Sequence, residues 1–409
     1  MKMYRFILIL LIAAAFAFVA CNRNNNGNSG AEPTGAELQA ALEALEQMAG
    51  VGANAPTSTT ASTPAPATTP TTTQSATPTA APVSGPSTWT AVADSPFANA
   101  IDAIAWGTAG NAGGRFVAGD WDGKMAYSTD GASWTAVVDS TFGYSVINDI
   151  AFGMDAAGNG RFVAVGMSGK IAYSTDGASW TAVDATGAFG TTNIYSVAWG
   201  NNRWVAGDAE GKMAYSADGA AWTAVADSTF DMYIYIYDIA FANGIGKGNG
   251  RFVAGALSGQ IAYSDDNGVT WTAVADSKFG NSGIDAIAYG NSRFVAVGTD
   301  GKMAYSTDGA SWTAVANSGF NSRIWGIDFG IASNAGNGNA GGRFVAGGDN
   351  GSMAYSADGA SWTAVGEGIL GTYTTLMGTG ATADISDVAY GSGRFVAVGQ
   401  GGKIAYADW

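Results

Sequence analysis

A twelve-residue stretch, AYSTDGASWTAV at residues 126–137, recurs with few changes along most of the chain. Its tryptophan, Trp134, has counterparts at Trp89, Trp180, Trp222, Trp271, Trp312 and Trp362. Repeats with a period of roughly 40 to 50 residues are supersecondary units that bury their apolar faces against one another. The chain is therefore expected to fold as a set of similar units, each stabilised by its neighbours.

Four short segments with strand-like patterns make up each repeat. In the first complete repeat they are residues 101–106, 115–118, 124–127 and 134–137. Alternating apolar patterns bounded by Gly, Asn and Asp predict β-strands. Between the second and third segments the chain carries pairs suited to the positive-φ positions of tight hairpins, namely Asp122-Gly123, Ser168-Gly169, Asp300-Gly301 and Asn350-Gly351.

Seven repeats of four antiparallel strands predict an all-β fold, a seven-bladed β-propeller. The ends of the repeat region indicate how the ring closes. The last repeat stops at residues 404–409 without its fourth strand, whereas residues 87–92 form a fourth strand with no repeat before it. We predict that this N-terminal strand completes the last blade, which would cover two otherwise open sheet edges.

The region before the repeats has three compositional parts. Residues 1–20 carry Lys2, Arg5 and a short apolar run, and they are predicted to be a signal peptide. Residues 21–52 form a polar tether with a short helix predicted over residues 37–48, and residues 53–86 are a Thr/Pro/Ala-rich stalk predicted to be disordered. The propeller is assigned to residues 87–409.

The only cysteine of the chain, Cys21, directly follows the apolar run. Residues 18–21, FVAC, resemble a bacterial lipobox, in which the cysteine becomes the lipidated N-terminus. This resemblance implies a lipoprotein anchored to the cell envelope, and Asn22 after the cysteine implies the outer membrane. The alternative is ordinary secretion with an incidental cysteine.

The charge and composition of the chain exclude several kinds of function. It has no histidine, which removes the usual general base and most zinc sites. Its net charge of −15 argues against nucleic-acid binding, because no basic stripe exists to neutralise phosphates. We expect no cofactor and no metal, and a monomeric protein.

The turn between the third and fourth segments resembles a known repeat. Residues 264–271, SDDNGVTW, match the Asp-box, or BNR repeat, of sialidase-like propellers, and the other copies are one residue shorter. In that superfamily the aspartate folds back on the hairpin backbone and the tryptophan packs into the blade. The resemblance implies a structural role for Asp130, Asp176, Asp218, Asp266, Asp308 and Asp358.

Sialidases of this superfamily use an arginine triad, a Tyr-Glu pair and an aspartic acid. The repeats hold only two glutamates, Glu210 and Glu367, and seven of their eight arginines occupy one repeated position. Only Arg323 lies outside that pattern. We expect the seven repeated arginines to pair with aspartates or turn carbonyls. The sequence leaves enzymatic activity undecided and favours a protein without it.

Positions that vary between otherwise similar repeats are free to serve a ligand. One such position is the second residue of each innermost strand, and another lies in the hairpin between the second and third strands. Loops on a rigid scaffold are the usual place for recognition, and exposed Tyr and Trp side chains suit sugars and proteins. The candidate ligand-binding residues are Asp102, Trp121, Tyr195, Tyr233, Tyr235, Tyr237, Asp285 and Trp325.

Three hypotheses about function follow. The first is a noncatalytic envelope lipoprotein whose loop face binds a glycan or a surface protein. The second is a glycoside hydrolase or lyase with an unfamiliar site built from Asp102, Asp285 and nearby tyrosines. The third is an envelope assembly scaffold, since some Asp-box propellers are similar to photosystem assembly factors. Neutral drift of the loop positions is the alternative to all three.

Overall fold

The computed structural model describes residues 86, 88–108, 113–155, 158–331, 341–375 and 380–409. The predicted signal peptide, the tether with its helix, the stalk and Cys21 lie outside these residues. No helix in the described part of the chain is long and apolar enough to cross a membrane.

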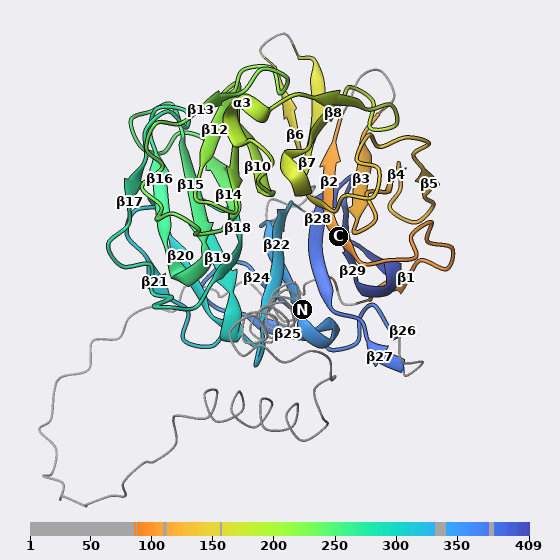
Figure 1. The fold of residues 1–409 in the computed structure, drawn as a ribbon. Coiled ribbons are helices and arrows are strands. Elements are labelled where there is room, and N and C mark those ends of the chain that lie inside the picture. The colour runs from red at the N-terminus through yellow and green to blue at the C-terminus, as the bar shows by residue number, and fades with distance from the viewer. Residues whose placement is uncertain (1–85, 87, 109–112, 156–157, 332–340, 376–379) are drawn as a thin grey trace, which may run out of the picture. The chain divides into compact units, whose positions relative to one another are not determined.

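Seven four-stranded antiparallel sheets surround a common axis (Figure 1), which confirms the predicted seven-bladed β-propeller. The inner strands are β2 (Ile101–Gly107), β6 (Ile147–Met154), β10 (Ile194–Gly200), β14 (Ile236–Ala242), β18 (Ile284–Gly290), β22 (Ile324–Gly330) and β28 (Ile385–Gly391). The second strands are β3 (Arg115–Asp120), β7 (Gly160–Gly166), β11 (Arg203–Asp208), β15 (Arg251–Ala256), β19 (Arg293–Gly298), β23 (Arg343–Gly348) and β29 (Arg394–Gly399).

The outer half of each blade is shorter. The third strands are β4 (Met125–Ser128), β8 (Ile171–Ser174), β12 (Met213–Ser216), β16 (Ile261–Ser264), β20 (Met303–Ser306), β24 (Met353–Ser356) and β30 (Ile404–Asp408). The outermost are β5 (Thr135–Ala136), β9 (Thr181–Val183), β13 (Thr223–Ala224), β17 (Thr272–Ala273), β21 (Thr313–Ala314), β25 (Thr363–Gly366) and, for the last blade, β1 (Thr90–Ala91). Blades 1 to 7 are numbered here by their inner strands in chain order.

Blade 7 contains both ends of the repeat region. Thr90 of β1 pairs with Tyr406 of β30, and Ala91 pairs with Ala405. The outermost strand of this blade therefore comes from the start of the repeats and its other three strands from the end. This pairing covers the edge of β30 that would otherwise be open.

The core consists of layers between neighbouring blades. Side chains of the second strands, such as Phe162 and Val163, are fully buried, and they pack against the inner strand of the adjacent blade. Burial of one such side chain contributes about 1.5–3 kcal/mol. Because each layer needs two blades, a single repeat has no complete core of its own.

The repeated turn between the third and fourth strands is stabilised by its own polar groups. In blade 1 the Asp130 carboxylate accepts hydrogen bonds from the amides of Ala132 and Ser133, at 2.9 and 2.8 Å, and from the Ser128 hydroxyl. The Trp134 indole donates to the Gly131 carbonyl at 3.0 Å. The same aspartate recurs in six turns, and we call these residues the turn aspartates: Asp130, Asp176, Asp218, Asp266, Asp308 and Asp358.

The repeated arginines join neighbouring blades through this turn. The Arg115 guanidinium lies 4.6 Å from the ring centre of Tyr127 in its own blade and donates to the Asp176 carbonyl of the next blade. Equivalent bonds run from Arg161, Arg251, Arg293 and Arg394 to the carbonyls of Asp218, Asp308, Asp358 and Asp130. The repeated turn therefore stabilises the ring as well as its own blade.

The hairpins between second and third strands differ from expectation in two blades. In five blades the short helical turns η2 (Met167–Gly169), η3 (Leu257–Gly259), η4 (Thr299–Gly301), η6 (Asp349–Gly351) and η7 (Gln400–Gly402) contain two consecutive positive-φ residues. In blades 1 and 3 only Gly123 and Gly211 have positive φ. There the Asp120 or Asp208 carboxylate accepts two amides of the hairpin, which takes the place of the second left-handed residue.

Two elements were not anticipated from the sequence. A short helix, α3 (Thr186–Phe189), precedes β10, and a β-hairpin of β26 (Thr372–Thr374) and β27 (Gly380–Thr382) is inserted before β28. Both lie in segments that connect one blade to the next. They interrupt no blade, so the repeat pattern did not reveal them.

Candidate ligand-binding face

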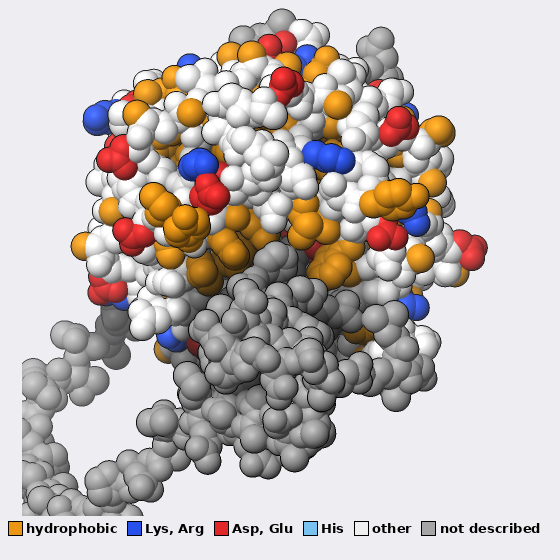
Figure 2. Space-filling view, viewed as in Figure 1, with side chains coloured by type: hydrophobic (Ala, Val, Ile, Leu, Met, Phe, Trp, Pro, Cys, Tyr) orange, Lys and Arg blue, Asp and Glu red, His pale blue; other side chains and the backbone are white. Residues whose placement is uncertain are grey.

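The strand order gives the propeller two chemically different faces. We call one the bulge face: it holds the seven connectors that lead into the inner strands and the seven hairpins between second and third strands. We call the other the turn face, because it holds the turn aspartates and the repeated arginines. In the view of Figure 2 hydrophobic side chains gather toward the middle of the molecule.

Every inner strand starts with a β-bulge. The register between β10 and β11 shifts between Ile194 and Ser196, so Tyr195 has no direct partner. A bulge re-aims the side chain of the extra residue. The seven bulge residues are Asp102, Asn148, Tyr195, Tyr237, Asp285, Trp325 and Ser386. These are the variable second positions singled out in the sequence.

Three tyrosines from blades 3 and 4 pack together at this face. The ring centres of Tyr195 and Tyr235 are 5.4 Å apart with planes 20° apart, which is a stacked pair. Tyr237 meets both edge-on, 5.6 Å from Tyr195 and 6.0 Å from Tyr235. One face of the Tyr195 ring and one face of the Tyr235 ring are therefore covered by each other and are closed to a ligand.

Blades 5 and 6 add an ion pair, Arg323 with Asp285, and the indole of Trp325 to this group. Arg323 forms a bidentate pair with Asp285, whose side chain is only 4% exposed. The guanidinium carbon lies 3.6 Å from the centre of the Trp325 ring. The Trp325 indole N–H donates to Asp349 at 2.7 Å. We call Tyr195, Tyr235, Tyr237, Asp285, Arg323, Trp325 and Asp349 the aromatic cluster.

The ionisable groups of the aromatic cluster favour hydrogen bonding over proton transfer. Burial, followed by the neighbouring Tyr235, raises the pKa of Tyr195 to about 12. Burial and the Asp285 charge raise the pKa of Tyr237 as well. Burial acts to lower the pKa of Arg323, but the bonds and charge of Asp285 raise it. At neutral pH the cluster therefore presents phenols and a charged ion pair.

Six of the eight candidate residues lie at or beside the axis on this face. Asp102 is 6% exposed and electrostatically linked to Tyr195, while Tyr195, Tyr235, Tyr237, Asp285 and Trp325 belong to the aromatic cluster. Trp121 and Tyr233 lie away from it. Trp121 is half-buried in the hairpin of blade 1, and Tyr233 is 67% exposed and interacts electrostatically with Lys212.

Sequence reasoning left two members of the aromatic cluster out of the candidate set. Arg323 was noted as the only arginine outside the repeated position, which was the signal that could have found it. Asp349 occupies the variable position of the hairpin between the second and third strands of its repeat. Their roles depend on partners 38 and 24 positions away in the chain, Asp285 in the preceding blade and Trp325 in the same blade, which only folding brings together.

Four further aspartates line the axis below the bulges, and we call Asp149, Asp238, Asp328 and Asp387 the axial aspartates. Each accepts the amide of the residue that follows it and an amide of the next blade. Asp238, for example, accepts Ile239 at 2.7 Å and Ile287 of blade 5 at 2.6 Å. The corresponding bonds to the next blade reach Val197, Tyr390 and Ile104. The sequence signal is an acidic residue inside an apolar strand, and it was not recognised.

We predict opposite pH responses for the axial and turn aspartates. Burial raises the pKa of Asp238 and Asp328 from 3.8 to about 6, so their contribution to stability is fully present below pH 3.8 and lost as pH rises through 6. In the turn aspartate Asp130 burial acts to raise the pKa, but bonds from Ser133 and Ala132 lower it. The stability that the ionised Asp130 contributes is therefore lost as pH falls through its lowered pKa.

The melting temperature should therefore be higher at pH 5 than at pH 8 and should fall again below pH 3.8. Asn at an axial position removes the ionisable group. Asp238→Asn should consequently flatten the change between pH 5 and pH 8, as measured by calorimetry in matched ionic strength. A melting temperature that rises steadily from pH 5 to pH 8 would contradict this assignment.

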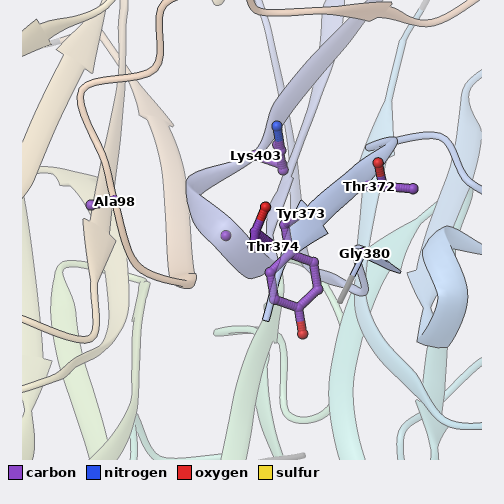
Figure 3. Close-up of a pocket in the computed structure, with 7 residues that line it drawn as sticks. Ala98, Thr372, Tyr373, Thr374, Gly380 and Lys403 are labelled. Atoms are coloured by element: carbon purple, nitrogen blue, oxygen red, sulfur yellow. The ribbon is translucent and has the colours of Figure 1, made fainter. Parts of the chain in front are cut away.

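A separate cavity of 310 Å³ opens on the bulge face near blade 7 (Figure 3). It is lined by Ala98, Thr372, Tyr373, Thr374, Gly380, Gly401 and Lys403. In Figure 3 the Tyr373 ring and the Lys403 side chain extend in opposite directions. The cavity includes no member of the aromatic cluster. Among the described residues no group of three or more acidic or cysteine side chains is placed to hold a metal ion.

A scan against protein-family models finds no match for this chain, and a search of curated proteins finds none either. Solved structures with a similar fold do exist. One is YCF48 bound to a D1 peptide, with a TM-score of 0.55 and 14% identity over 80% of this chain and 98% of that one. Another is YCF48 from Cyanidioschyzon merolae, with a TM-score of 0.55 and 17% identity over 78% of this chain and 98% of that one.

A third similar structure is a virginiamycin B lyase from Staphylococcus aureus. It is a catalytically inactive histidine-to-alanine variant solved with quinupristin, with a TM-score of 0.54 and 11% identity over 79% of this chain and 99% of that one. These identities are low, and the neighbours include a peptide-binding protein and a lyase. The comparisons therefore establish the β-propeller fold and leave its function to the site itself.

Proposed function

We propose that this protein is a noncatalytic lipoprotein of the bacterial cell envelope whose bulge face binds a polypeptide segment of another protein. The aromatic cluster is the observation that carries this proposal. It combines half-buried tyrosines, an indole and charged groups at the centre of a rigid ring, which is the composition of protein-binding hot spots.

The arrangement of the rings favours a polypeptide over a glycan. Sugar rings stack on free aromatic faces, but Tyr195 and Tyr235 cover each other and Arg323 covers one face of Trp325. What remains at the surface are the half-buried rings of the tyrosines and Trp325, with their phenol and indole groups. Such groups suit the backbone amides and side chains of a peptide.

Exposed apolar side chains lie on the same face as the aromatic cluster. The four most exposed large hydrophobic residues of the described chain all lie in its connectors: Val138 (103%), Tyr144 (94%), Met232 (73%) and Tyr233 (67%). Exposed apolar groups beside a polar centre are typical of protein-interaction surfaces. The similar structure of YCF48 was solved with a bound peptide, which supports the same use of the fold.

The hydrolase or lyase hypothesis has less support from the geometry. It places the site at Asp102, Asp285 and nearby tyrosines. Both oxygens of Asp285 are bound by Arg323, which holds the carboxylate in its ionised form. A carboxylate held in this way is poorly suited to protonating a leaving group.

Panning of a peptide display library on the purified full-length protein tests the proposal. We expect enriched peptides to bind the wild type and to lose at least about tenfold in affinity, or 1.4 kcal/mol, in a Tyr195→Phe/Tyr237→Phe/Trp325→Phe variant. Phe keeps the rings and removes the polar groups. The control variant Ile331→Ser changes an exposed apolar residue of the turn face, 59% exposed, and should bind normally.

Equal binding by both variants would refute the assignment of the face. A glycan array run in parallel tests whether the ligand is a glycan. Glycan binding that is lost in the same triple variant would replace the polypeptide with a glycan.

The envelope anchor gives a separate prediction. Lipidation requires the Cys21 thiol, since the acyl chain is carried by that sulfur. Cys21→Ser should therefore move nearly all of the protein from the membrane fraction to the soluble fraction and abolish labelling by a fatty-acid analogue, as seen by fractionation and gel fluorography. Unchanged membrane association of Cys21→Ser would refute the lipid anchor without bearing on the bulge face.

A further inference from the structure

The two faces of the propeller carry very different charge. The bulge face, counted over its connectors, its hairpins and the adjoining strand ends, holds sixteen acidic and seven basic residues, whereas the turn face holds nine acidic and eight basic residues. The acidic residues of the bulge face are Asp94, Asp102, Asp120, Asp122, Asp139, Asp184, Asp208, Glu210, Asp227, Asp231, Asp276, Asp285, Asp300, Asp349, Glu367 and Asp384. A net charge of this size on one side attracts partners of opposite sign.

The basic residues of the bulge face do little to offset this excess. Lys124, Lys212 and Lys278 each pair with an acidic residue close in sequence. Lys170 and Lys302 donate to the carbonyls of Phe142 and Phe279. Each of these five lysines has a local partner, so they leave the excess of acidic over basic residues on the bulge face in place.

The aromatic cluster shows how this face holds a cation. The Arg323 guanidinium lies on the Trp325 ring and is bound by the Asp285 carboxylate, while the Asp349 carboxylate accepts the Arg323 backbone amide at 3.3 Å. Carboxylates combined with an aromatic face are the usual environment of a bound arginine or lysine. Exposed Asp231 and Asp300 and half-buried Asp122 extend the acidic surface around it.

We propose that the polypeptide bound by the bulge face is a basic segment, rich in lysine and arginine. This inference rests on the proposed function and adds the chemistry of the partner. Basic side chains would meet the carboxylates around the aromatic cluster, and the intervening apolar residues would meet exposed side chains such as Met232 and Tyr233. A surface of this charge repels nucleic acid and anionic lipid, so those partners are disfavoured.

The test compares three peptides of equal length: one alternating lysine with tyrosine and alanine, one with glutamate in place of lysine, and one with serine in place of lysine. Binding to the full-length protein is measured by fluorescence anisotropy at low and at physiological salt. We expect the lysine peptide to bind at least about tenfold more tightly than the serine peptide. This advantage should shrink as salt screens the charges.

Substitution of aspartate by asparagine shows which carboxylates attract the basic peptide. Asp122, Asp231 and Asp300 accept side-chain bonds that an amide oxygen can also accept, so the triple variant Asp122→Asn/Asp231→Asn/Asp300→Asn should remain folded. It should lose about threefold in affinity per charge removed. The single variants Asp231→Asn and Asp155→Asn are matched, because both aspartates are exposed and Asp155 lies on the turn face.

Each outcome decides one of the two ideas. Equal binding of all three peptides, lost in the Phe variant of the aromatic cluster, would overturn the basic partner and leave the proposed function standing. An equal loss of peptide affinity in Asp155→Asn and Asp231→Asn would show that the charge attraction is not specific to the bulge face. That result would also overturn the basic partner. Spermine binding as tightly as the lysine peptide would mean a site for small cations. No binding of any peptide would refute the proposed function.

Discussion

Asp285→Ala should destabilise the propeller by about 3–5 kcal/mol, because it leaves the Arg323 guanidinium charged and without its bidentate partner. The side chains of this pair are only 4% and 12% exposed. Removal of one partner of such a pair costs more than removal of both. We therefore expect the double variant Asp285→Ala/Arg323→Met to recover at least half of the loss in urea unfolding.

The control for this prediction is Arg394 and Asp408 on the turn face. Their carboxylate is 77% exposed, so Asp408→Ala should change the free energy of unfolding by less than about 1 kcal/mol. A loss in Asp285→Ala no larger than that in Asp408→Ala would show that burial of the pair does not determine its importance. A double variant as unstable as the single one would point to the indole contact instead.

Gly309→Ala should be a costly methyl addition in the repeated turn of blade 5. Gly309 has φ +73°, and an added Cβ would lie 2.6 Å from a methyl carbon of Val253 in the preceding blade. A non-glycine residue at positive φ costs about 1–3 kcal/mol, and overpacking adds about 1–3 kcal/mol. We expect a total loss of roughly 2–5 kcal/mol in the free energy of unfolding.

Gly280→Ala separates the two causes. Gly280 has φ +62°, but no atom lies within 4 Å of the position of an added Cβ. It should show only the backbone cost, so the difference between the two variants measures the contact between blades. Equal losses would mean that the turn contributes nothing to packing against the preceding blade.

The arrangement of the blades could be predicted from the sequence because it depends on local patterns. Each repeat carries its own strands and turns, and the split of the last blade follows from where the repeats begin and end. Even the bulges had a signal: Ile101 and Ile104 are three residues apart, and the strict alternation of a strand is broken between them. That spacing recurs in several inner strands and predicts an extra residue.

The contacts that define the site could not be predicted, because they join different blades. Asp387 binds the amide of Ile104 across 283 positions of the chain, and Arg323 reaches Asp285 in the preceding blade. Their geometry depends on how the ring closes. The sequence likewise identified Tyr195, Tyr235 and Tyr237 as available aromatics, whereas the structure shows that they cover one another.

Photo-crosslinking in living cells tests most directly whether the bulge face is the binding face. Benzoylphenylalanine is introduced in place of Tyr233 on the bulge face or in place of Ile331 on the turn face, since both residues are exposed. We predict a discrete polypeptide adduct from position 233 that is competed by the lysine peptide, and none from position 331. Adducts from position 331 alone, or equal adducts from both positions, would contradict the account.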